Sequence, residues 1–175
     1  MNRFTLSAVL LGTISLGFAN PASPVEPSPA PFHCQVPCGI YGDGMRIHMM
    51  QEDIDTIAKG MAQIEEMEAA DAFAHNQMVR WVMNKDTHAG AIQEQVASYW
   101  LAQRIKAPKG REGGERYVTQ LKVLHGITVA AMKCKQSTDV AHVERLRGLV
   151  KELTAVYFSE ADQKHMNEHM KEEKR

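Results

Sequence analysis

The chain has 175 residues, a length that suits a single domain, and a formal net charge of −1 with no block of basic residues. This balance excludes the electrostatic footprint of a nucleic-acid-binding protein or of a protein held on an anionic membrane. Aromatic residues make up only 6% of the chain, whereas there are 11 methionines, which favour helices and fill cores flexibly. We therefore expect an all-α protein with no nucleic-acid partner and no stable membrane association.

Residues 1–19 have the pattern of a signal peptide. A positive start at Arg3 precedes an apolar run that ends at Ala19 and is too short to span a bilayer comfortably. Gly17 and Ala19 place small residues at the −3 and −1 positions of a cleavage site. We expect an exported protein, periplasmic or extracellular. The alternatives are a membrane anchor at this end, or a location in the cytoplasm or an organelle lumen.

Residues 20–32 are rich in proline and hold five of the seven prolines in the chain. Proline fixes φ and lacks a backbone donor, so the segment is expected to be a stiff, extended linker that a protease can reach. The composition changes sharply at His33. We predict that residues 20–32 form a propeptide or linker that a processing peptidase removes on maturation.

The run at residues 33–41 (HCQVPCGIY) has the residue types of a metal site. Cys34 and Cys38 lie four residues apart, and Pro37 prevents a regular helix between them. Thiolates suit Cu(I), Zn, Fe–S clusters and Ni, and a planar set of nitrogen and sulfur donors suits Ni(II) or Cu(II). If cleavage makes His33 the N-terminus, its amine, the amide nitrogen of Cys34 and the two thiolates supply such a set. The imidazole of His33 would then be an optional fifth ligand.

The first two predicted helices follow this run. The first has apolar residues spaced alternately three and four apart, the seam of a bundle helix: Ile47, Met50, Ile54, Ile57, Met61 and Ile64. The second is predicted over about residues 74–105, with Lys85 interrupting its inward face. That face is expected to hold Met78, Val82, Ala89, Ile92, Val96 and Tyr99.

The third and fourth helices follow a break that contains Pro108, Gly110, Gly113 and Gly114. The third is predicted over about residues 115–135, with Val118, Leu121, Leu124, Thr128 and Ala131 inward. Ser137-Thr138-Asp139 supplies the N-cap of the fourth, whose seam is Val143, Leu146, Val150, Leu153 and Tyr157. The sequence thus predicts a four-helix bundle over residues 44–160, a metal-binding hook at residues 33–41 and a polar tail at residues 161–175.

The run His-Cys-x-x-Pro-Cys-Gly-x-Tyr, followed by a helix that opens with Arg46-Ile47, resembles the hook of the nickel-containing superoxide dismutase family. The resemblance implies a homohexamer of four-helix bundles, made as a precursor and trimmed to expose the histidine. It implies conversion of superoxide to dioxygen and hydrogen peroxide by Ni(II)/Ni(III) cycling. It also implies one nickel ion per subunit as cofactor.

The resemblance assigns roles to individual residues of the hook. Nickel would be bound by His33 through its amine and imidazole, by Cys34 through its amide nitrogen and sulfur, and by Cys38 through its sulfur. Tyr41 would be the catalytic residue over the open axial face. Pro37 would turn the hook, in the family through a cis peptide.

Further positions are expected to surround the ligands. Gln35 stands where many members have Asp, and Arg46 opens the first helix. His48 stands where some members carry a Glu that hydrogen-bonds the ligating imidazole, if one residue is missing between hook and helix. An arginine that supports the metal site in the family has no clear counterpart, and Arg80 and His88 are the candidates.

The alternative function is an exported metal carrier, for copper or nickel, that uses the same Cys-x3-Cys pair. Copper-delivery domains with such a pair usually have a thioredoxin-like scaffold that contains strands, and the sequence shows no strand pattern. The third cysteine, Cys134, lies near a predicted helix end among lysines. We expect it to take no part in the metal site.

Overall fold

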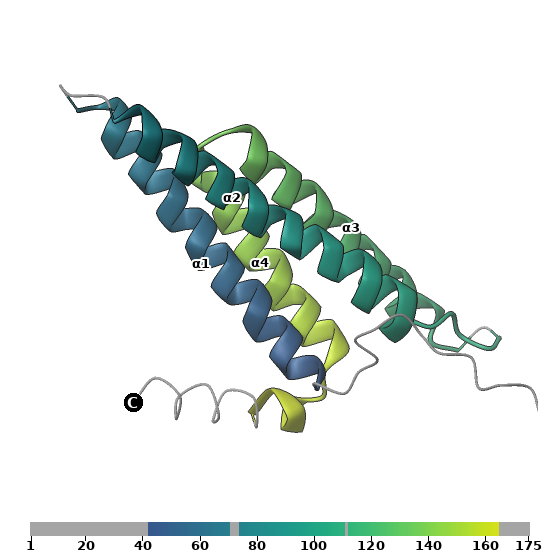
Figure 1. Cartoon of the computed structure of the whole chain (residues 1–175). Coiled ribbons are helices and arrows are strands. Elements are labelled where there is room, and N and C mark those ends of the chain that lie inside the picture. The colour runs from purple at the N-terminus through teal and green to yellow at the C-terminus, as the bar shows by residue number, and fades with distance from the viewer. Residues whose placement is uncertain (1–41, 71–73, 111, 165–175) are drawn as a thin grey trace, which may run out of the picture. The chain divides into compact units, whose positions relative to one another are not determined.

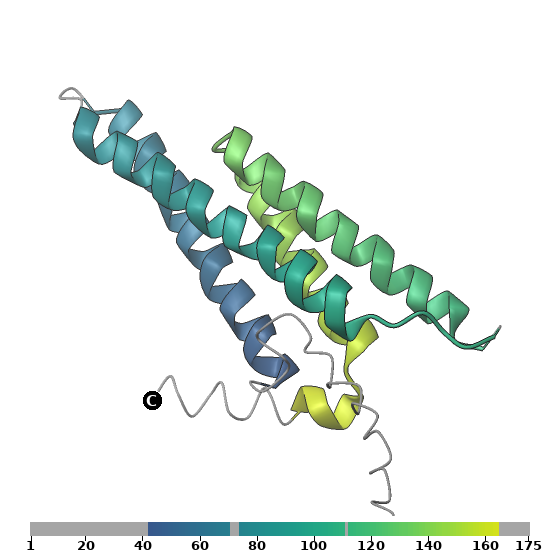
Figure 2. The ribbon, with the colours of Figure 1, turned by 45° about the vertical axis from the view of Figure 1, so that its right-hand side comes forward.

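The computed structural model describes residues 42–70, 74–110 and 112–164, so the predicted signal peptide, propeptide and hook lie outside the described residues. Its helical elements are α1 (Asp43–Glu68), α2 (His75–Gln95), η1 (Val96–Arg104), α3 (Gly114–Gln136) and α4 (Val140–Tyr157). The element η1 is a π-helix that continues α2 without a break. Figures 1 and 2 show α1, α2 with η1, α3 and α4 lying side by side as a bundle. No strand occurs in these ranges, and the predicted all-α four-helix bundle is confirmed.

The seam predicted for α1 forms its buried face. All six predicted residues, from Ile47 to Ile64, are at most 3% exposed, and Gly60 is buried among them. From Ile47 to Ile64, each turn of α1 therefore places at least one large apolar side chain against its main neighbours, α2 and α4.

The seam predicted for α4 is also buried, with Leu149 added to it and Tyr157 half-buried. Asp139 is the N-cap, and its side chain accepts a hydrogen bond from the backbone amide of Ala141 at 2.9 Å. On α3, a Cβ built at Gly126 would lie 3.1 Å from Cδ2 of Leu149. The absence of a side chain at this position therefore permits the close approach of α3 and α4.

The structure differs from the predicted inward face of α2. Val82 is 38% exposed, and burial begins only at Lys85, continuing through Ala89 and Ile92. Figures 1 and 2 show the reason: α1 and α2 continue past the connection between α3 and α4, so this end of α2 has fewer neighbours.

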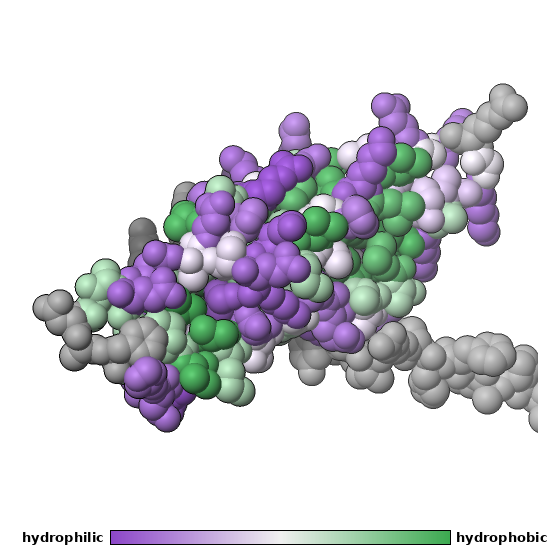
Figure 3. All heavy atoms as spheres, turned by 90° about the horizontal axis from the view of Figure 1, so that it is seen from above, coloured by the Kyte–Doolittle hydropathy of each residue, from purple (hydrophilic) through white to green (hydrophobic). Residues whose placement is uncertain are grey.

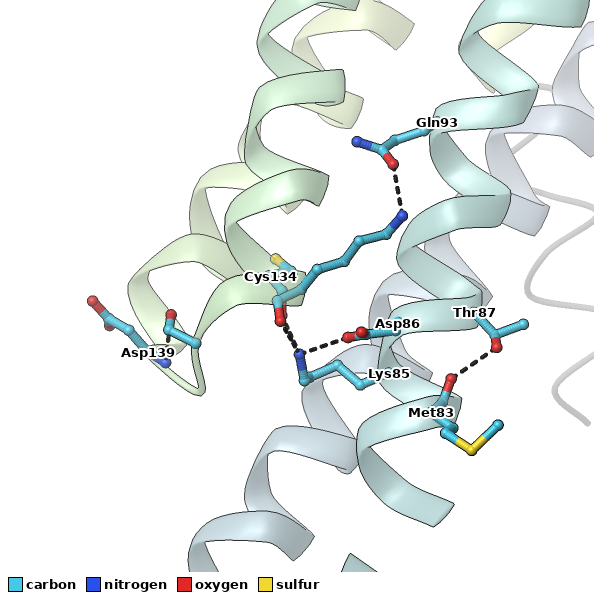
Figure 4. Close-up of polar contacts among 9 residues, drawn as sticks. Met83, Lys85, Asp86, Thr87, Gln93, Cys134 and Asp139 are labelled. Atoms are coloured by element: carbon cyan, nitrogen blue, oxygen red, sulfur yellow. Dashed lines mark hydrogen bonds and ion pairs between the residues drawn. The ribbon is translucent and has the colours of Figure 1, made fainter. Parts of the chain in front are cut away.

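Lys85 of α2 is buried against the C-terminal end of α3, where its ammonium group contacts the last turn of that helix (Figure 4). Its residue is 3% exposed, and its ammonium group donates to the carbonyl oxygens of Cys134 and Lys135 at 2.7 and 2.8 Å. A third bond, of 3.0 Å, reaches the carboxylate of Asp86. The last carbonyls of a helix have no partner within it, so this lysine satisfies acceptors that the helix itself leaves open.

Apolar side chains are also present on the surface of the bundle. Figure 3 shows one face on which polar side chains alternate with patches of apolar ones. The exposed large apolar residues of the described ranges include Val79, Met83, Val118 and Met132. None of the described helices combines the length and the apolar character needed to cross a membrane.

Candidate metal centre

The predicted site residues fall into two groups with respect to the structure. Arg46 and His48 lie in the first turns of α1. The others lie outside the described residues: His33, Cys34, Gln35, Pro37, Cys38 and Tyr41. The structure therefore describes the start of α1, to which the hook is joined, and the side chains around it.

His48 lies beside the buried seam of α1, and its side chain is 24% exposed. Its Nε2 is 3.6 Å from a carboxylate oxygen of Glu52, one turn further along the same helix. The carboxylate beside His48 thus comes from residue 52, one turn beyond the position where some family members carry the Glu. The predicted contact between His48 and the His33 imidazole stays a prediction.

Arg46 lies against the π-helix. The carbon at the centre of its guanidinium group is 4.9 Å from the centre of the Tyr99 ring, which places the cation over the aromatic face. Its Nη1 also lies 3.8 Å from the sulfur of Met49. Arg46 therefore links the first turn of α1 to η1.

Asp43, the first residue of α1, receives hydrogen bonds from three side chains of other elements. Its Oδ1 accepts from the Tyr99 hydroxyl at 2.5 Å, and its Oδ2 accepts from Arg104 at 2.5 Å and from the Tyr157 hydroxyl at 2.7 Å. Burial raises the pKa of Asp43, but the bonds from Arg104 and the two phenols outweigh it, so the pKa lies below its ordinary value. Burial and the bond to Asp43 raise the pKa of Tyr99 to about 12.

Asp43 also borders an open pocket of about 680 Å³ at this end of the bundle. Its lining holds three cations, Arg104, Lys106 and Arg116, against two carboxylates, Asp43 and Asp162. Tyr157 and Phe158 bring aromatic surface. Sequence reasoning missed Asp43, Arg104 and this pocket. No local pattern marks them, because residues 43, 104 and 157 meet only when α1, η1 and α4 pack together.

The two candidates for a supporting arginine or histidine lie elsewhere in the chain. His88 pairs with Asp53, with 2.6 Å between Nδ1 and Oδ1, in the middle of the α1–α2 contact. Arg80 precedes Trp81, whose carbonyl lies beside Gly60 towards the far end of α1. Arg46 and Arg104 bring guanidinium groups to the start of α1, and Arg116 lines the pocket beside it.

The described residues hold no group of three or more His, Cys, Asp and Glu side chains that could bind a metal ion. Cys134 is fully buried in the core, and burial raises the pKa of its thiol to about 11. A thiol is a metal ligand as the thiolate, so Cys134 is a poor donor. That Cys134 takes no part in the metal site stays a prediction.

The predicted donors at residues 33–38 fit nickel by their chemistry. Two thiolates, an amine and an imidazole are soft or borderline ligands, and a site rich in nitrogen and sulfur suits Ni(II) in a square arrangement. The two cysteines of the chain other than Cys134, Cys34 and Cys38, both belong to this run.

Comparison with known proteins identifies the family. The sequence model of the nickel-containing superoxide dismutase family matches residues 28–161, which include both the predicted hook and the four-helix bundle. No curated protein and no solved structure matches the chain. The match covers most of the chain, so this chain belongs to the nickel-containing superoxide dismutase family.

Proposed function

We propose that the mature chain converts superoxide to dioxygen and hydrogen peroxide by Ni(II)/Ni(III) cycling, with one nickel ion per subunit. The observation that carries this proposal is the family match over residues 28–161, in which a hook with suitable donors precedes a four-helix bundle. Two superoxide ions and two protons give one dioxygen and one hydrogen peroxide, so the site must bind a small anion and supply protons. Bound nickel would supply the one-electron redox chemistry, since thiolate and amidate donors bring its two oxidation states into range.

The protein's own residues have distinct tasks in this proposal. His33, Cys34 and Cys38 hold the metal, and the Tyr41 hydroxyl orders a small anion or water beside it. The pocket beside the start of α1 is lined by Arg104, Lys106 and Arg116 but also by Asp43 and Asp162, which leaves a small excess of positive charge there. Positive charge at the approach to a site raises the local concentration of an anionic substrate.

Maturation is part of the proposal, since the amine donor exists only if His33 is the first residue. We propose that residues 1–19 direct export to a periplasmic or extracellular location, and that a peptidase removes residues 20–32. We further propose a homohexamer. Its support is the family resemblance together with exposed apolar residues such as Val79 and Met83, which a partner subunit can cover.

The alternative function, an exported metal carrier, gains no support from the family match. The regular secondary structure of the described ranges is entirely helical, whereas copper-delivery domains with a Cys-x3-Cys pair usually have scaffolds that contain strands.

The test uses a chain that begins at His33, loaded with nickel. Cys34→Ser and Cys38→Ser are expected to abolish catalysed superoxide decay, because a neutral hydroxyl does not replace thiolate donation. Cys134→Ala is the matched control: it removes a buried thiol that is not a ligand and should retain nickel and activity. A normal rate in either serine variant would refute the assignment.

A further inference from the structure

The carboxylate of Asp43 and its three donors, Tyr99, Arg104 and Tyr157, form a cluster that we call the Asp43 anchor. The Asp43 side chain is 13% exposed, and its hydrogen bonds come from η1 and α4. An ionised carboxylate has about four acceptor positions, so the anchor uses most of them. Three helical elements are thereby joined at one side chain.

The π-helix makes this convergence possible. Tyr99 and Arg104 are five residues apart in η1, and both reach Asp43. In an α-helix, residues five apart point about 140° away from each other, since each residue turns by about 100°. A π-helix closes its turns with i→i+5 hydrogen bonds, which brings such residues towards the same side. A regular α-helix would present one of these donors to Asp43 and turn the other away.

The donors of the anchor are held in turn by aromatic packing. The ring of Trp100 is fully buried and meets the rings of Tyr99 and Tyr157 edge to face, with centroids 5.4 and 4.9 Å apart. Buried rings with fixed neighbours have little rotamer freedom, so the two phenols are preorganised as donors.

The start of α1 has no local cap of its own. Gly42 is the N-cap residue and has no side chain to accept from the first turn, whereas α4 begins with the capping carboxylate of Asp139. A carboxylate in the first turn also interacts favourably with the positive end of the helix dipole. The position of this helix end therefore depends on the Asp43 anchor.

Asp43 is close to the predicted metal donors along the chain. It follows Tyr41 by two residues and Cys38 by five. A chain of five residues spans at most about 18 Å even when fully extended, so the position of Asp43 limits where the hook can lie.

We propose that Asp43 is a positioning residue for the dismutase reaction: the Asp43 anchor fixes the point at which the hook leaves the bundle, and thereby the placement of Tyr41 and the nickel ligands. This inference rests on the proposed function. It adds a requirement that the donor set does not contain, namely a salt-bridged carboxylate outside the metal-binding run.

The test compares Asp43→Asn with Asp55→Asn in the nickel-loaded chain that begins at His33. Asp55 also lies on α1 and pairs with Arg147 at 2.8 Å, but its side chain is 68% exposed. Both changes remove one carboxylate charge from the same helix. The measurements are nickel content, superoxide decay, the electron paramagnetic resonance spectrum of the nickel, and circular dichroism, all well below the unfolding temperature.

Asp43→Asn is expected to stay helical and bind nickel, but with a broadened nickel spectrum and a rate lower by roughly 10- to 100-fold, as expected for misplacement by about an ångström. Asp55→Asn should match the wild type. Asp43→Glu, which retains the charge, should recover part of the rate. If Asp43→Asn does not fold, Tyr157→Phe replaces it, because that change removes a single hydroxyl from the anchor and keeps the ring.

Two results would overturn this inference but not the proposed function. One is a wild-type rate in the anchor variant. The other is a loss of rate that is proportional to the unfolded fraction of the protein while the nickel spectrum stays unchanged. A wild-type chain that binds no nickel or shows no catalysis would instead overturn the proposed function, and this inference with it.

Discussion

Replacing Lys85 with methionine should destabilise the bundle more than any single loss of surface charge. Methionine retains most of the aliphatic length but removes the ammonium group, which donates to the carbonyls of Cys134 and Lys135 at 2.7 and 2.8 Å. Those carbonyls belong to the last turn of α3 and would lose their donor inside the protein.

The magnitude follows from these contacts. A buried carbonyl left without a donor costs about 1–3 kcal/mol, and because the bond to Lys135 is only part-buried, about 6 kcal/mol is the upper bound for the two. The change also removes the cost of burying an ammonium group, which offsets part of this loss. The bond to Asp86 adds little, because that carboxylate is 45% exposed. We expect a net loss of about 2–4 kcal/mol in the free energy of unfolding.

The assay is urea unfolding followed by circular dichroism, at one fixed protein concentration because association would shift the apparent stability. Lys133→Met is the matched control: Lys133 is exposed in the same last turn of α3 and should contribute about 0.3–1 kcal/mol through the helix dipole. The reasoning is refuted if Lys85→Met costs no more than Lys133→Met.

Three further predictions concern packing, pH and the hook. Gly148→Ala should raise the unfolding free energy by about 0.5–1 kcal/mol, because a Cβ there meets nothing within 4 Å. Gly126→Ala should not show this gain, because its Cβ would press against Leu149. Equal denaturation midpoints for the two variants would contradict this prediction. The pKa of Tyr99, raised by burial to about 12, lies above the ordinary phenol value of about 10, so the contribution of Tyr99 to stability is complete below pH 10 and is lost as pH rises towards 12. The melting temperature should therefore fall over this pH range, and less steeply in Tyr99→Phe. Identical declines in the two proteins would contradict this prediction. Tyr41→Phe should keep nickel and the helical fold but change the affinity for small anions, measured by inhibition of superoxide decay, and loss of nickel would show that the assigned role is wrong.

The parts of the fold that the sequence predicted are those in which one periodic pattern dominates. In α1, six apolar residues alternate at three and four positions without a competing face, and all are buried. In α4, the same spacing was preceded by a capping carboxylate at Asp139, which the structure confirms.

The errors arose where tertiary packing decides between faces. On α3, Val118 was predicted inward but is 45% exposed, whereas Gln120 is buried and donates to the carbonyl of Val156. A polar side chain can be buried when a distant helix offers a partner, and hydrophobic periodicity does not record that partner. Lys85 was predicted on the inward face and is buried there, but its acceptors lie about 50 positions away along the chain, so the sequence did not show what it bonds.

The candidate site likewise has one part that local sequence predicts and one part that only tertiary packing creates. The metal-binding run could be predicted because its donors are adjacent in sequence and their chemistry is specific. The Asp43 anchor could not, because it joins α1, η1 and α4, and because nothing in the residue pattern distinguishes a π-helix from the end of a regular α-helix.

The central claim is that a nickel site with His33 as its first residue performs the dismutation. Its most direct measurement is the rate of superoxide decay with two nickel-treated chains, one beginning at His33 and one retaining Phe32, with both N-termini verified by mass spectrometry. The chain beginning at His33 should catalyse the decay, and the chain retaining Phe32 should not, because the extra residue converts the amine donor into an amide. Equal catalysis by the two chains would contradict the account.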